Sequence, residues 1–222
     1  MRFASAATFA GLLTVVSAHF QLQYPAPRGP FVEDQELTFC DGYANAVSNR
    51  TQFPISGGFF SLNSEHPQWT LGAIISTVQN PNNFANFTDS SGNEQTAIPF
   101  FQTSGEGSFC APLDISDITG VTLKAGMNVT VQWIFDGGDG ELFQCADLTL
   151  ADIPPPNITC TNATNAAVTP LSSAPAFTTG SSTGSSTSSA PSASNTNGAA
   201  ISSTAFGVSG IFGVVGVILA LI

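Results

Sequence analysis

Two histidines are the residues of this sequence best suited to hold a metal ion. His19 follows a stretch with the features of a cleavage site, and His66 is the only other histidine in 222 residues. If the chain is cut before His19, its free α-amine and its own Nδ1 can close a chelate ring on one ion, and a second imidazole can supply a third nitrogen. Three nitrogens in this arrangement suit square-planar or tetragonal Cu(II). We therefore predict a copper site built on His19 and His66.

Asp147 is the expected oxygen ligand of this site. It lies in FQCADLTL, beside a cysteine in the middle of an expected strand. The competing interpretation is an ordinary solvent-facing strand carboxylate. Glu65, as the neighbour of His66, and Asp41, in FCDGY, are weaker candidates. Since the unperturbed pKa of an α-amine is about 7.7–8, copper must compete with a proton there, and the affinity should fall as the pH drops.

Residues 1–18 have the pattern of a secretory signal peptide. Arg2 supplies the positive region, residues 9–16 the apolar region, and Val16-Ser17-Ala18 the small-residue cleavage motif. Cleavage after Ala18 makes His19 the first residue of the mature protein. The predicted copper site depends on this cut, because the amine ligand does not exist before it.

Residues 205–222 are apolar and uncharged. They follow a Ser/Thr-rich region and a cluster of small residues, which is the pattern of a GPI-attachment signal. Asn197 is the expected attachment residue, with Ser194 and Asn195 as alternatives, and residues 198–222 are the expected propeptide. This places the protein at the extracellular face of the plasma membrane or in the cell wall. A single-span tail anchor is the competing interpretation.

The charge balance excludes one class of partner. The chain has 15 Asp and Glu against 4 Lys and Arg, a formal net charge of −11. A surface so poor in basic residues has no electrostatic footprint for phosphates, so we expect no nucleic-acid binding. An acidic exterior suits a secreted protein or one that collects cations.

Cysteines and sequons agree with a secretory route. An even number of cysteines predicts two disulfides, and the absence of CxxC argues against a zinc or iron–sulfur site; three pairings are possible, among Cys40, Cys110, Cys145 and Cys160. Five Asn-x-Ser/Thr sequons predict N-glycosylation, at Asn49, Asn86, Asn128, Asn157 and Asn162.

Composition divides the chain into one folded domain, residues 19–162, and a disordered stalk rich in Ser and Thr, residues 163–197. Within the domain, apolar residues alternate along Val129–Phe135 and Leu142–Leu150, which predicts two strands joined by a Gly/Asp turn. A further strand is expected at Val121–Leu123, and short apolar runs follow the same pattern at 58–62, 71–78 and 98–101, with one short helical turn at 115–118. This pattern predicts an all-β fold, an antiparallel β-sandwich with an inter-sheet disulfide.

The sequence resembles the fungal, GPI-anchored relatives of lytic polysaccharide monooxygenases typified by the Bim-type copper acquisition factors. The resemblance is carried by AHFQLQYPAPRG, FCDGY, SEHPQWTLG, LKAGMNVTVQW and FQCADLTL. It implies an immunoglobulin-like β-sandwich that binds one copper ion through a histidine brace, here His19 and His66, with Asp147 completing the site. It also implies copper acquisition at the cell surface, with transfer to a membrane importer, or a role in the cell wall.

An oxidative polysaccharide enzyme is the less favoured alternative. Such an enzyme usually has a late-strand aromatic near its copper, where this sequence offers Asp147, and an anionic ligand there would favour Cu(II). Trp69 and Trp133 are isolated, and pairs such as Phe59-Phe60 and Phe100-Phe101 suit a core better than a sugar platform. A structural or adhesive wall mannoprotein, which could contact wall glycans, is the remaining alternative.

Overall fold

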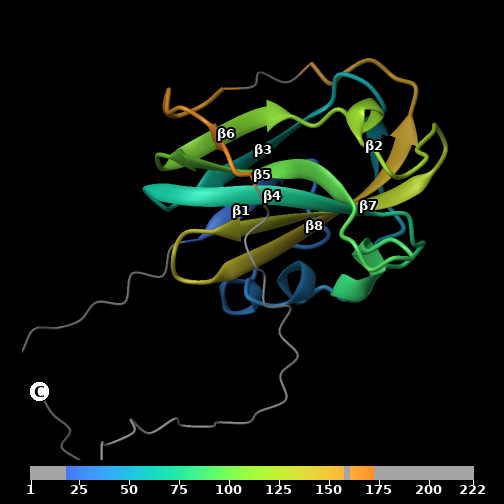
Figure 1. Ribbon diagram of the computed structural model, residues 1–222, viewed down its shortest axis with the longest axis horizontal. Coiled ribbons are helices and arrows are strands. Elements are labelled where there is room, and N and C mark those ends of the chain that lie inside the picture. The colour runs from blue at the N-terminus through green and yellow to red at the C-terminus, as the bar shows by residue number, and fades with distance from the viewer. Residues whose placement is uncertain (1–18, 158–160, 173–222) are drawn as a thin grey trace, which may run out of the picture. The chain divides into compact units, whose positions relative to one another are not determined.

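The computed structural model describes residues 19–157 and 161–172, which form two β-sheets (Figure 1). One sheet has the order β1-β3-β6 and the other the order β2-β8-β7-β4-β5-β9. The strands are Phe20–Tyr24 (β1), Thr51–Pro54 (β2), Phe59–Ser64 (β3), Gln68–Ser76 (β4), Thr96–Ser104 (β5), Gly107–Pro112 (β6), Asn128–Asp136 (β7), Glu141–Ala151 (β8) and Thr169–Pro170 (β9). Four 3₁₀ helices lie between them, at Glu33–Gln35, Phe39–Gly42, Phe84–Phe87 and Ile115–Asp117. The predicted all-β sandwich is confirmed.

Strands β7 and β8 form the long hairpin that the alternating pattern predicts. They pair antiparallel from Asn128↔Thr149 to Asp136↔Glu141, around the Gly/Asp turn. The expected strand at Val121–Leu123 is wrong: both residues lie outside any strand, half-buried against the core. The sheet also departs from the antiparallel prediction at one edge, where β2 pairs with β8 in parallel.

The core between the sheets is rich in aromatic side chains. Phe20 stacks on Phe135, with ring centroids 4.9 Å apart, and Trp69 also stacks on Phe135, at 5.3 Å. Trp133 is fully buried. Such contacts add roughly 0.5–1.5 kcal/mol per pair to the area that they bury, so the aromatic residues hold the two sheets together.

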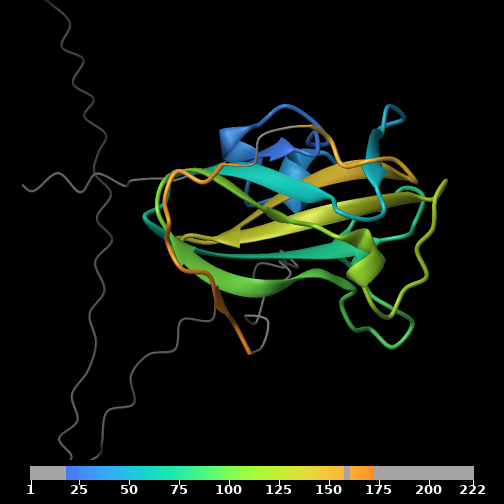
Figure 2. The same cartoon turned by 90° about the horizontal axis from the view of Figure 1, so that it is seen from above.

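A second apolar cluster covers the outer face of the six-stranded sheet. Ile134 and Phe143 point to this face and pack with Phe39, Phe84 and Phe87 from outside the strands. Phe84 and Phe87 come from the 3₁₀ helix before β5, whereas Phe39 comes from the chain between β1 and β2. We call residues 25–47 of that chain the 25–47 segment, which gathers on one side of the molecule (Figure 2). This is why β8 is buried on both faces.

The disulfide between Cys40 and Cys145 fastens the 25–47 segment to β8. It joins a 3₁₀ helix to a strand, so the predicted inter-sheet disulfide is wrong for this pair. Cys110 is also disulfide-bonded, and Cys160, the fourth cysteine of the sequence, lies outside the described residues.

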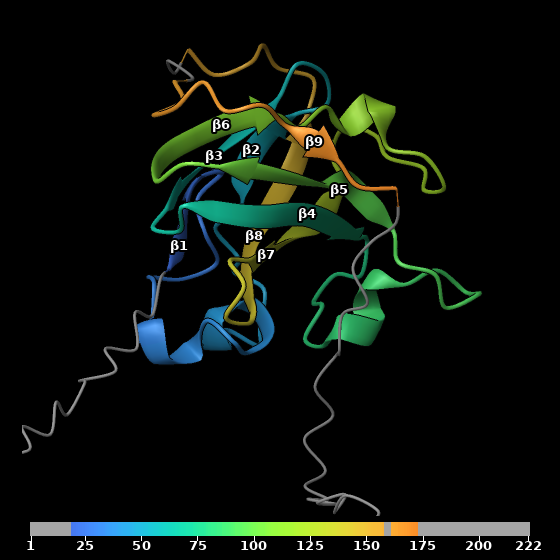
Figure 3. The same ribbon diagram turned by 60° about the vertical axis from the view of Figure 1, so that its left-hand side comes forward.

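Residues 161–172 pack along the open edges of the two sheets. Ala163 N donates to Ser108 O at 2.7 Å on β6, and Leu171 N donates to Phe100 O at 2.9 Å on β5. Between these points Thr103 Oγ1 donates to a backbone carbonyl in the same stretch, and β9 pairs with β5 (Figure 3). Residues 163–172, which the sequence prediction assigns to the stalk, therefore lie against the edges of the sheets. The rest of the stalk prediction falls outside the described residues.

Candidate metal centre

The three-stranded sheet brings the two predicted histidines to one end of the sandwich. β1 and β3 pair antiparallel, with Phe20 opposite Ser64. One residue beyond, Glu65 N donates to His19 O at 2.9 Å. His19 therefore lies opposite the residue that precedes His66.

His66 is held in a closely packed, buried position. Its side chain is 6% exposed and its ring lies 5.4 Å from that of Phe135. Its backbone N–H donates to Ser64 Oγ at 3.1 Å, and the backbone of Gly137 leaves no room for a Cβ beside the imidazole. The ring Nε2 lies 3.6 Å from Asp139 Oδ1. The alternative of an ordinary surface histidine is therefore wrong for His66.

His19 lies between two carboxylates of the 25–47 segment. Its Nδ1 is 2.5 Å from Glu36 Oε2, and its Nε2 is 3.2 Å from Glu33 Oε1. Burial lowers the pKa of His19, but the hydrogen bond and charge of Glu36, with the charges of Glu33 and Glu65, outweigh it and raise the pKa. Burial raises the pKa of Glu36 to about 7, against the lowering effect of His19.

Asp147 is not part of this end of the molecule. Phe143 N donates to Glu36 O, and Asp147 lies four residues further along β8. At about 3.3 Å per residue, Asp147 lies roughly 13 Å along β8 from Phe143, the residue that bonds to Glu36.

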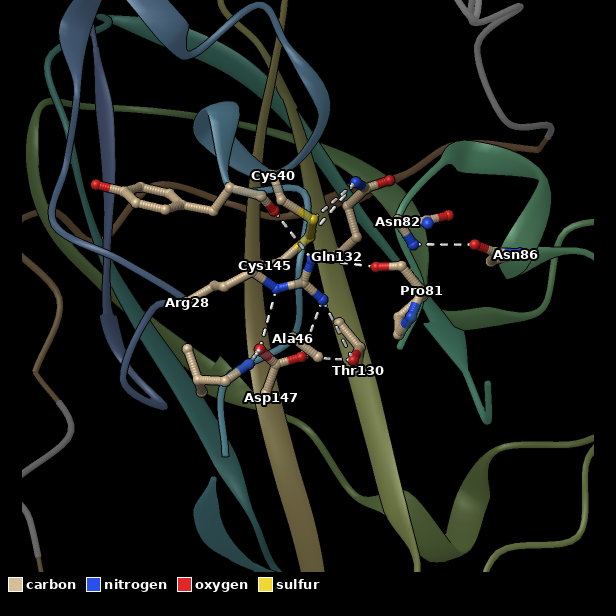
Figure 4. Close-up of a disulfide and its surroundings, with 12 residues drawn as sticks. Arg28, Cys40, Ala46, Pro81, Asn82, Asn86, Thr130, Gln132, Cys145 and Asp147 are labelled. Atoms are coloured by element: carbon tan, nitrogen blue, oxygen red, sulfur yellow. Dashed lines mark hydrogen bonds and ion pairs between the residues drawn. A yellow bond between two sulfur atoms is a disulfide. The ribbon is translucent and has the colours of Figure 1, made fainter. Parts of the chain in front are cut away.

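The carboxylate of Asp147 is occupied by buried hydrogen-bond donors. Arg28 donates from Nε to Oδ2 at 3.0 Å and from Nη2 to Oδ1 at 2.9 Å (Figure 4). Thr130 Oγ1 adds a bond to Oδ1 at 2.6 Å, and Val47 N adds one to Oδ2 at 2.9 Å. Arg50 Nη1 lies 3.8 Å from Oδ1. The charge of Asp147 is thus compensated by arginine and by hydrogen-bond donors, which favours a structural ion pair over a metal ligand at this position.

The two weaker oxygen candidates have different positions. Asp41 is buried, and its Oδ2 accepts a hydrogen bond from Val32 N at 3.0 Å. Burial raises the pKa of Asp41 to about 6, against the lowering effect of that bond. Glu65 is exposed next to His66. Sequence reasoning missed Glu33, Glu36 and Asp139, and only the Gly/Asp composition of the turn around Asp139 distinguished any of them.

Across residues 19–157 and 161–172, no three His, Cys, Asp or Glu side chains come close enough together to hold a metal ion. The set predicted from the sequence also includes the α-amine of His19. In the uncut chain that nitrogen is an amide joined to Ala18, so the site needs the cleavage before its nitrogen ligands are complete.

Both tryptophans are buried, Trp69 at 2% and Trp133 at 0% exposure. The large apolar side chains that the described part of the chain exposes are aliphatic, namely Val32, Leu37, Val78, Ile153 and Val168. The described surface therefore has no tryptophan platform of the kind that stacks on a polysaccharide.

The remaining predicted sites are the glycosylation sequons and the processing signals at the two ends of the chain. Among the sequons, Asn49, Asn157 and Asn162 are exposed, and Asn86 and Asn128 are half-buried. The predicted signal peptide, the attachment residue Asn197 and the propeptide fall outside the described residues. Within the described ranges, no helix is long and apolar enough to cross a membrane.

Comparison with known proteins adds an independent observation. A family model described as copper acquisition factor BIM1-like matches residues 17–165. Copper acquisition factor BIM1 of Cryptococcus neoformans var. grubii is 43% identical over 151 residues, 65% of this chain and 66% of the relative, and its counterpart in var. neoformans is 41% identical over the same shares. An uncharacterized protein of Aspergillus fumigatus is 35% identical over 159 residues, 68% of this chain and 61% of the relative. The matched region thus spans just under two thirds of these relatives.

Proposed function

Because the chain belongs to the family of BIM1-like copper acquisition factors, we propose that it binds one copper ion through His19 and His66 at the cell surface and passes it on in copper acquisition. The observation that carries this proposal is the bond between Glu65 N and His19 O, which sets the two histidines at one end of the sandwich.

The donors fit Cu(II). Cleavage after Ala18 would convert the His19 nitrogen into an amine, so that amine, Nδ1 and the His66 imidazole supply three nitrogens. Asp139 takes the place first expected of Asp147, since its Oδ1 lies 3.6 Å from His66 Nε2 and its side chain is 42% exposed. A carboxylate that reaches the ion from a surface turn can complete the site without breaking a buried ion pair.

Transfer of copper, and not oxidation of a polysaccharide, is the activity that we propose. The buried tryptophans and an anionic fourth donor both support a binding protein. The recipient we propose is a membrane copper importer, reached by a protein attached to the outer membrane face through a GPI anchor.

Copper titration of the protein as cells secrete it tests the ligand set, with the first residue confirmed by mass spectrometry. We expect one equivalent of Cu(II) to bind, with three nitrogens visible in its electron paramagnetic resonance spectrum. A glycine inserted between Ala18 and His19, and His66→Ala, should each weaken binding by more than an order of magnitude. Asp139→Asn should weaken it and Asp147→Asn, in the folded protein, should not. Unchanged affinity after the glycine insertion would rule out the amine ligand.

A further inference from the structure

We propose that Glu36 is a built-in competitor of copper: it occupies Nδ1 of His19 in the copper-free protein and must withdraw when copper binds there. This inference rests on the proposed function. In this proposal Glu36 is a positioning residue that limits the affinity of His19 for copper and favours copper release. Its role differs from that of Glu33, the second carboxylate at His19.

The contact between Glu36 and His19 is short and shielded from water. Oε2 lies 2.5 Å from Nδ1, and the Glu36 side chain is 3% exposed. The backbone fixes this position, because Glu36 O accepts a hydrogen bond from Phe143 N at 2.8 Å on β8. The hydrogen bond to β8 therefore holds the Glu36 backbone where its side chain reaches the His19 ring.

His19 is the titratable partner that the structure gives to Glu36. Within residues 19–157 and 161–172, the hydrogen bond of the other Glu36 oxygen, Oε1, is the long contact of 3.4 Å with Phe20 N. The two arginines of the described chain that form ion pairs, Arg28 and Arg50, form them with Asp147 and not with Glu36. A buried carboxylate with one charged partner binds that partner strongly, since a lone buried charge is costly.

The same nitrogen cannot serve both partners. A ring nitrogen that gives a hydrogen bond to Glu36 carries a proton, and a nitrogen that binds copper has lost it. Chelation with the α-amine uses Nδ1, so copper binding must break the bond to Glu36. Loss of copper lets that bond re-form.

Glu33 contacts the other ring nitrogen and has the opposite role. Its Oε1 lies 3.2 Å from Nε2, and its side chain is 65% exposed. A metal-bound histidine commonly gives its second N–H to a carboxylate, so this contact is compatible with bound copper. Because it is exposed to water, it should contribute little to affinity.

Charge-conserving substitutions separate the two carboxylates. Glu36→Asp keeps the negative charge near the site but withdraws the carboxylate by one methylene, so Nδ1 is freed. We expect the affinity for Cu(II), measured by competition with a chelator, to rise about tenfold, from the loss of a charge-assisted hydrogen bond. The matched variant Glu33→Asp should change it less than about twofold. An unchanged or weaker affinity in Glu36→Asp would overturn the proposal.

The copper-free wild-type protein offers a second measurement that needs no variant. Long-range ¹H–¹⁵N correlation spectra should show His19 with a proton on Nδ1, and one equivalent of diamagnetic Cu(I) should remove it. A bare Nδ1 in the copper-free protein would overturn the proposal even if Glu36→Asp failed to fold. If the wild type bound no copper through His19, the proposed function itself would fail, whereas normal wild-type binding with no gain in Glu36→Asp would reject the competitor alone.

Discussion

The imidazole of His66 lies directly against the backbone of Gly137, with no space for a side chain between them. Gly137 belongs to the turn that joins β7 to β8, and Asp139 lies two residues later. One turn therefore both fixes the histidine ring and presents a carboxylate 3.6 Å from its Nε2.

Gly137→Ala should displace the His66 ring and weaken copper binding by about tenfold or more. The ring is buried against Phe135, so it can make room for a methyl group only by leaving its position. Copper titration with a competing chelator measures the effect. Gly126→Ala is the control, because it places its methyl group in open space and should cost only the strain of a positive φ, about 1 kcal/mol of stability. Wild-type affinity in Gly137→Ala would show that this contact does not position the ring.

Asp147→Asn should destabilise the fold and leave the copper stoichiometry at one. Removal of one partner leaves the buried Arg28 without its counter-ion, which costs roughly 3–5 kcal/mol in the free energy of unfolding. Urea unfolding measures the loss. Asp152→Asn is the matched control, an exposed carboxylate just beyond the same strand, and should change stability by less than about 0.5 kcal/mol. Lost copper binding with unchanged stability would return Asp147 to the ligand set.

Asp41→Asn should change the pH dependence of stability. Burial raises the pKa of Asp41 from 3.8 to about 6, so the folded protein holds this proton more tightly than the unfolded chain does. The Asp41 contribution to the free energy of unfolding therefore decreases as the pH rises from about 4 to about 6. Asparagine removes that contribution and tolerates the left-handed backbone at this position, where φ is 56°.

Urea unfolding at several pH values provides the check. The stability of Asp41→Asn relative to the wild type should increase between pH 4 and pH 6 and then stay constant. Parallel stability curves for the two proteins would contradict the prediction.

A chain that ends at Asn162 should be less stable and more prone to associate than one that ends at residue 172. The shorter chain loses β9 and the hydrogen bonds of Ala163, Ala167 and Leu171. At about 1 kcal/mol per bond we expect a loss of roughly 2–4 kcal/mol, and β5 becomes an open edge. Thermal unfolding and light scattering compare the two chains. Equal melting temperatures would mean that residues 163–172 only rest on the sheet.

The sequence predicts the parts of this fold where neighbouring residues determine the outcome. The alternation from Val129 to Phe135 suffices for β7, because each side chain faces a buried surface on one side or the other. The parallel β2 and the cover of the outer face depend on contacts between residues about a hundred positions apart. Local periodicity carries no information about such contacts.

The predicted site shows the same division. The residue types of His19 and His66 indicate copper. The sequence around a strand carboxylate, in contrast, does not show whether that carboxylate faces water, a metal or an arginine. Asp147 pairs with Arg28, which lies 119 positions away in the sequence, and no sequence motif predicts this pairing. For the same reason the contacts of Glu36 with His19 and of Asp139 with His66 could be found only in the structure.

Finally, the two carboxylates that contact the His19 ring come from a segment that contributes no strand to either sheet. The 25–47 segment is joined to β8 by the Cys40–Cys145 disulfide, by Arg28 on Asp147, and by the hydrogen bond from Phe143 N to Glu36 O. These attachments use positions other than the Glu33 and Glu36 side chains. Under the proposed function, substitutions at those two side chains therefore change how firmly copper is held, while the sandwich that carries the histidines stays the same.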